Sequence, residues 1–138
     1  MGDKDAAVDE RGNPLKTEFG AFYPTGHIIA SFDAAQKAEQ VQRELQAAGA
    51  PTTDCVLYTP PQMVAFAQRN IEEAGVLAHL GTSVSTLKSH LEAAKQGATF
   101  LLIKAADDDS AERVLEIMRR AGFKSAQRYH SLAIEELK

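Results

Sequence analysis

Two stretches of equal length decide the fold of this chain: HIIASFDAAQKAEQVQRELQAAG at residues 27–49 and FLLIKAADDDSAERVLEIMRRAG at residues 100–122. Each starts with an apolar run of strand length and continues with apolar residues at helical spacing. Each also ends at a glycine, as helices commonly do. Aligned without a gap, the two stretches share an alanine, a glutamate, a valine and the closing Ala-Gly pair. The chain therefore contains an internal strand–helix repeat.

A short apolar segment follows each copy of the repeat, at residues 54–59 and 125–132, and completes a β-α-β unit. Between the two units, apolar residues at helical spacing predict two more helices. The first opens after Pro60 and Pro61, which suit the first turn of a helix, and ends near Gly75. The second ends at Gly97. The units are therefore separated by a helical pair.

Two β-α-β units joined in this way predict an α+β fold, a ferredoxin-like sandwich with the helical pair inserted between strands two and three. In that topology the antiparallel strand order is 4-1-3-2, and the first and last helices cover one face of the sheet. We expect the other face to be open. A flavodoxin-like parallel α/β sheet is the alternative, because strands separated by helices often pair in parallel.

Composition narrows the class of protein. The chain has 138 residues, 44% of them hydrophobic and 25% charged, which suits one globular domain. Its net charge of −4 makes a nucleic-acid partner unlikely. The single cysteine, Cys55, rules out an intrachain disulfide and favours a reducing, cytoplasmic location. The sequence shows neither a secretory signal nor an apolar run long enough to span a bilayer, so no membrane partner is expected.

The domain boundary is expected near residue 25. Residues 1–25 are assigned to a flexible N-terminal tail, because they begin with acidic and polar residues that lack periodicity, and residues 26–138 form a single α/β domain. The tail ends in a cluster of three aromatic residues, Phe19, Phe22 and Tyr23. The sequence leaves open whether this cluster docks on the domain.

The order of these elements resembles the small bacterial general-stress-protein-like α/β domains. The resemblance covers residues 27–132 and rests on the two repeat stretches and the central helical segment that reaches Gly97-Ala98. It implies the same α/β architecture. The family has no settled activity, so the resemblance assigns no functional residue.

Period-two alternation sorts the strand residues by face and suggests a polar cluster on the open face. His27 on the first strand and Lys104 on the third fall on that face, and Arg128 and His130 on the last strand are expected to join them. Such a group could hold a small anionic ligand. The candidate ligand-binding residues are His27, Ser31, Tyr58, Lys104, Arg128 and His130. No catalytic residue, metal ligand or cofactor is assigned.

The remaining reactive residue types have plainer interpretations. His79 and His90 are expected on the surface, since their separation matches no known metal motif. Cys55 lies in an apolar strand and is expected to be an inert core thiol. The acidic run Asp107 to Asp109 marks the start of a helix.

Three functions compete. The first is a non-enzymatic, stress-associated or regulatory interaction module that forms a homodimer through the open sheet face. The second is a sensor or enzyme of the dimeric α/β-barrel type that binds a small anionic ligand. The third is an RNA- or ribosome-associated factor that stacks bases on Phe100 and Tyr58.

Overall fold

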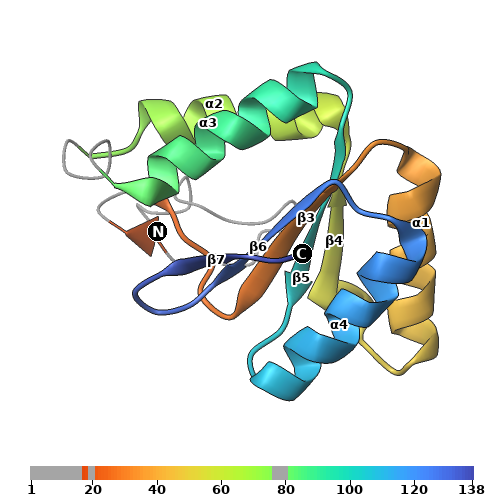
Figure 1. Ribbon diagram of the computed structural model, residues 1–138. Helices are drawn as coiled ribbons and strands as arrows, with labels where there is room; N and C mark the ends of the chain where they lie inside the picture. The colour runs from red at the N-terminus through yellow and green to blue at the C-terminus, as the bar shows by residue number, and fades with distance from the viewer. Residues whose placement is uncertain (1–16, 19–20, 76–80) are drawn as a thin grey trace.

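The computed structural model describes residues 17–18, 21–75 and 81–138, and it is an α+β fold built on an antiparallel sheet of five strands (Figure 1). The order in the sheet is β4-β5-β3-β6-β7, and every neighbouring pair is antiparallel. The strands are β3 (His27–Phe32), β4 (Cys55–Tyr58), β5 (Thr99–Lys104), β6 (Ser125–Tyr129) and β7 (Ile134–Glu136). The four strands expected from the sequence thus stand in the expected order, and the parallel alternative is wrong.

Helices connect the strands in the expected sequence. They are α1 (Ala35–Ala47), α2 (Pro60–Glu72), α3 (Thr82–Lys95) and α4 (Asp108–Ala121), with a single 3-10 turn, η2 (Thr52–Asp54), before β4. Thr59 and Gln62 form a capping box at the start of α2, and Pro60 occupies its first position. Asp107 caps α4 through a 2.7 Å hydrogen bond from the Ser110 amide.

The end of α4 needs its glycine. Gly122 has φ +88°, a left-handed conformation that side chains with a Cβ disfavour. The start of α1 differs from what its sequence suggests, because Ala34 occupies the cap position without a side-chain bond. Asp33 instead forms an ion pair with Lys37 at 3.0 Å, which holds the pKa of the Asp33 carboxyl below its usual value.

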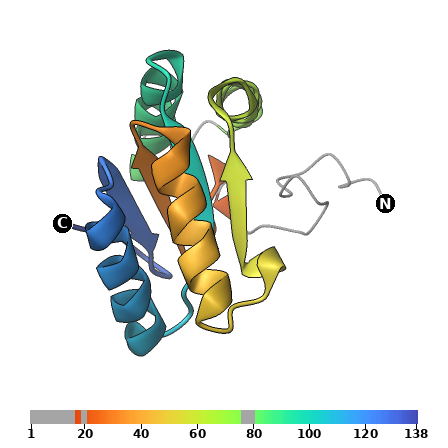
Figure 2. The same ribbon diagram turned by 90° about the vertical axis from the view of Figure 1, so that its right-hand side faces the viewer.

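Helices cover both faces of the sheet, so the expectation of an open face is wrong. α1 and α4 lie on one face, and α2 and α3 lie side by side on the other (Figures 1 and 2). Ile28, Leu101 and Ile103 point into the first layer, whereas Ile29, Phe100 and Leu102 point into the second. The helical pair inserted between β4 and β5 folds back over the sheet because those second-face side chains are apolar and need cover.

The segment expected at residues 125–132 is shorter in the structure, because β6 ends at Tyr129. The chain then turns, and Ile134–Glu136 forms the edge strand β7, which pairs with β6. Arg119 on α4 holds the end of this segment, since its Nε and Nη2 atoms donate to the Lys138 carbonyl at 2.9 and 2.6 Å.

The folded region begins before residue 26. Residues 1–16 and 19–20 of the expected tail, Phe19 among them, lie outside the described residues. Thr17–Glu18 (β1) pairs with Ala21–Phe22 (β2). Tyr23 is only 4% exposed, and its ring meets that of Tyr129 edge-on at 5.2 Å. Tyr23 is therefore part of the core of the second face.

The Tyr23 hydroxyl should contribute measurably to stability. It donates a 2.7 Å hydrogen bond to the His130 carbonyl and so ties the N-terminal segment to the β6–β7 turn. We expect Tyr23→Phe to lower the free energy of unfolding by about 1 kcal/mol, the usual net value of such a bond. Urea denaturation followed by circular dichroism measures it. A free N-terminal tail would instead leave the unfolding midpoint unchanged.

Candidate functional site

The six residues expected to bind an anion do not form one cluster. His27 and Lys104 are opposite each other on β3 and β5, as expected. Ser31 is buried and shares a 2.7 Å hydrogen bond with Ser125. Tyr58 is buried against Phe66, with 5.4 Å between the ring centroids. Neither of these two side chains lies on an open surface.

The side chains of the last strand point to the opposite faces of the sheet from those expected. Arg128 is the register partner of Ile28, so it lies on the α1–α4 side, where its Nη1 donates to Asp108 at 2.9 Å. Tyr129 takes the second face. His130 leaves the sheet at the turn and bonds Glu135 at 2.9 Å. A shift of one residue along a strand reverses every side chain, so this single error separates Arg128 from His27 and Lys104.

The surfaces that two of the expected functions require are covered. Phe100 is fully buried and Tyr58 is 5% exposed beneath α2 and α3, so neither ring can stack on a nucleic-acid base. The same two helices occupy the sheet face through which a homodimer was expected to form. The helical pair therefore covers the sheet surface on which both expectations depended.

A pocket of about 450 Å³ opens in the first layer, where α1 and α4 meet the ends of β4 and β5. We name it the α1–α4 pocket. Its apolar part is formed by Leu45 of α1, Val114 and Ile117 of α4, and the strand residues Cys55 and Ile103. All five side chains belong to the apolar core of this layer and are buried. The pocket therefore reaches down to the core.

Charged residues of both signs border this apolar part: Asp54, Lys104, Arg113, Glu116 and Arg120. The Lys104 side chain lies with that of His27, its register partner, on the other face of the sheet. Arg120 is occupied, because its Nη2 lies 3.0 Å from Glu44 on α1. Together with the Gln40 amide, this guanidinium lowers the pKa of the Glu44 carboxyl. Arg113 is exposed, donates a 3.4 Å hydrogen bond to Ser110 and, within the described residues, has no carboxylate within 4.0 Å, so its guanidinium is available to a ligand.

The C-terminal end of α1 also faces the pocket, through Ala48 and Gly49. The carbonyl oxygen of Ala48 accepts no hydrogen bond from any donor in the described ranges. Such carbonyls give the end of a helix a partial negative charge. The pocket thus presents acceptor groups as well as cations.

Cys55 was expected to be buried, and it is, with 1% of its surface exposed. Its carbonyl accepts a 3.2 Å hydrogen bond from the Gln42 side chain of α1, which joins that helix to the start of β4. This contact fixes one side of the pocket. No sequence pattern indicated the pocket, because its lining comes from separate segments that only the folded chain brings together.

His90 was expected on the surface, and this expectation is wrong. His90 is a residue of α3 with 3% of its surface exposed, and its ring meets that of Phe100 on the sheet edge-on at 5.2 Å. Burial lowers its pKa to about 4, and its Nε2 atom has no hydrogen-bond partner within the described residues. The helical spacing of His90 with Leu87 and Val84, three and six residues before it, was the available signal. His79 lies outside the described residues.

A second hollow of about 330 Å³ lies between α3 and β7. Four hydroxyl side chains of α3 face Ile134 and Glu136 there. It lacks the apolar part that the α1–α4 pocket has. The described residues bring no three histidine, cysteine or acidic side chains together in a way that could hold a metal ion.

Comparisons with protein-family models, with curated proteins and with solved structures find no match to this chain. Among the helices of the described ranges, none has both the length and the apolar character required to cross a membrane. The proposed function therefore rests on the geometry of the site.

Proposed function

We propose that this protein is a non-enzymatic regulatory module that binds a small molecule in the α1–α4 pocket. The observation that carries the proposal is the pocket of about 450 Å³, which combines a buried apolar part with a few charged groups at its rim. Binding sites for small molecules typically have this size and this composition. The expected ligand therefore changes from a small anion to a molecule that joins a charged group to an apolar one.

The arrangement of reactive groups supports binding over catalysis. The one cysteine of the chain is in the layer of α1 and α4, whereas the buried His90 is in the layer of α2 and α3. The sheet separates the two side chains, so they cannot act as a nucleophile and its base.

For the fold, we propose the ferredoxin-like class with an added edge strand. Support comes from the order β4-β5-β3-β6, from the two β-α-β units and from α1 and α4 packed together on one face. The inserted α2–α3 pair closes the second face. The first face is then the place where a ligand can reach the core.

The proposal is tested by closing the pocket. Ala48 is exposed at the end of α1 and lines the pocket, while the neighbouring Ala47 is exposed but does not line it. Ala48→Trp should therefore fill the pocket, and Ala47→Trp is its matched control. The ligands are aliphatic carboxylates, aliphatic amines and apolar amino acids, titrated while the amide signals of Ser110 and Arg113 are followed by NMR.

We expect at least one of these ligands to shift both amide signals in the wild type and in Ala47→Trp. Its affinity should fall at least about tenfold in Ala48→Trp, because the indole occupies the volume that the ligand needs. If no ligand shifts the signals, or if Ala48→Trp binds as well as the wild type, the proposed function is wrong.

A further inference from the structure

The α1–α4 pocket carries groups of opposite sign above one apolar surface. Arg113 projects from α4. Asp54 ends η2, which connects α1 to β4. Asp54 and Glu116 have no cation within 4.0 Å in the described part of the chain. Cations and carboxylates therefore line the same pocket without neutralising one another directly.

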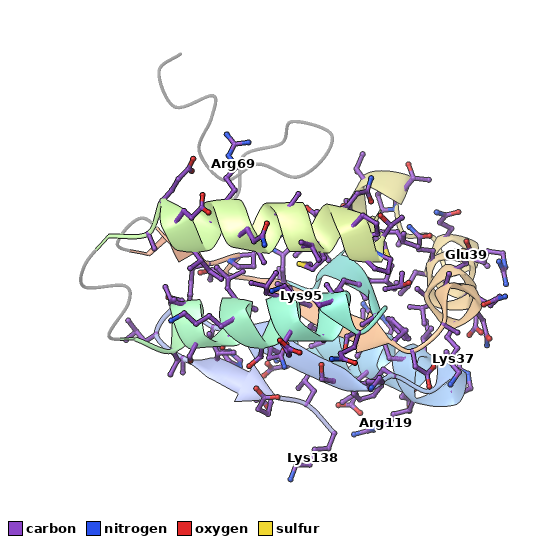
Figure 3. The ribbon with its side chains drawn as sticks, turned by 90° about the horizontal axis from the view of Figure 1, so that it is seen from above. Lys37, Glu39, Arg69, Lys95, Arg119 and Lys138 are labelled. Carbon is purple, nitrogen blue, oxygen red and sulfur yellow. The ribbon has the colours of Figure 1, made fainter. Side chains whose placement is uncertain are left out.

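The end of α1 adds to the acceptor side. The other three helices each carry a basic residue in the last turn, Arg69 in α2, Lys95 in α3 and Arg119 in α4, and Figure 3 labels these side chains. The last turn of α1 has none. A positive group near the C-terminal carbonyls of a helix is stabilising. At α1 the cation comes instead from Arg120 of α4, whose guanidinium pairs with Glu44 in the last turn. The Ala48 carbonyl beside the pocket still accepts no hydrogen bond from the described residues.

We infer that the pocket binds a small zwitterion, an α-amino acid with an apolar side chain. This inference rests on the proposed function and specifies its ligand. The carboxylate of the amino acid pairs with Arg113. Its ammonium group is accepted by Asp54 and by the free Ala48 carbonyl at the end of α1. The apolar side chain contacts Val114, Ile117 and the other buried residues of the pocket.

A ligand of single charge would use only half of these groups. A fatty carboxylate would leave Asp54 and the Ala48 carbonyl facing an apolar chain, and an aliphatic amine would do the same to Arg113. Polar groups that lose water without gaining a partner oppose binding. The pocket should therefore distinguish the zwitterion from both of its singly charged counterparts.

Three compounds with the same branched chain test this inference: L-leucine, 4-methylpentanoate, which lacks the ammonium group, and 3-methylbutylamine, which lacks the carboxylate. Calorimetric or NMR titration of the full chain gives the three Kd values. We expect leucine to bind at least about tenfold more tightly than either counterpart, because charge-assisted hydrogen bonds are the strong ones.

Two variants test which residue binds each charged end of the ligand. Arg113→Gln should weaken leucine and 4-methylpentanoate by about tenfold and leave 3-methylbutylamine unchanged. Asp54→Asn should weaken leucine and the amine and leave the carboxylate unchanged. Arg43→Gln, at an exposed position of α1 outside the pocket, is the control and should alter none of the three.

The outcomes separate the two proposals. Equal affinity for leucine and 4-methylpentanoate, or for leucine and the amine, contradicts the inference that the ligand is a zwitterion. It leaves the proposed binding function in place. Binding of a singly charged compound without leucine has the same meaning. Failure of all three compounds, together with every other ligand of the NMR series, removes both proposals.

Discussion

Phe100→Ala should lower the free energy of unfolding by about 3–5 kcal/mol, the range found for large aromatic side chains removed from a core. Phe100 is fully buried on the second face of the sheet, in the same apolar cluster as Met63 and Ala67 of α2 and Leu87 of α3. Truncation would leave a cavity between the sheet and both helices. Urea denaturation of the wild type and the variant gives the difference.

Leu132→Ala is the control for this measurement. Leu132 is 93% exposed, so its truncation should change the free energy of unfolding by less than about 0.5 kcal/mol. If Phe100→Ala cost as little as this control, α2 and α3 would not cover the second face in solution.

Acidification should destabilise the protein through His90. The folded state holds the pKa of this ring at about 4, below the ordinary value of 6.5, because burial disfavours the charged imidazolium. The unfolded chain therefore binds more protons between these two values. The stabilising contribution is complete above pH 6.5, decreases as the pH falls toward 4 and levels off below that. The total loss is about 3 kcal/mol.

His90→Leu isolates this contribution. The variant has no group to titrate at this position, so its free energy of unfolding should vary less between pH 6.5 and pH 4 than that of the wild type. Carboxylates such as Asp33 and Asp107, whose pKa values are lowered in the folded state, titrate alike in both proteins and cancel in the comparison. Parallel curves for the two proteins would show that His90 does not titrate in a buried setting.

The sequence contained a signal for the covered second face that alternation alone misses. β3 and β5 read HIIASF and TFLLIK, and nearly every residue in both is buried. A strand that is covered on both faces shows a continuous apolar run, whereas a strand with one solvated face alternates. Leu102 and Phe100 were thus apolar because α2 and α3 lie over them.

The candidate site could not be predicted from the sequence in the same way. The phase of β6 was ambiguous because Ala126, Arg128, Gln127 and Tyr129 offer no clean alternation, and the pairing of Ile28 with Arg128 settled it. His27 and Lys104 came together as expected because both lie on strands of clear phase. Arg113 lies at the edge of the buried stripe of α4. Many surface arginines have such a position, so the sequence does not mark Arg113 as a ligand-binding residue.

The sequence by itself determined the strands and helices of the two repeat units, the glycine that ends α4 and the apolar stripes of the helices. These features depend on residues a few positions apart, through helical spacing, capping and backbone conformation. Only the tertiary structure decided that α2 and α3 cover the second face, that β6 turns Arg128 toward α4, and that α1 and α4 leave a pocket between them. Those outcomes depend on how residues distant in the chain pack against one another, which no local pattern encodes.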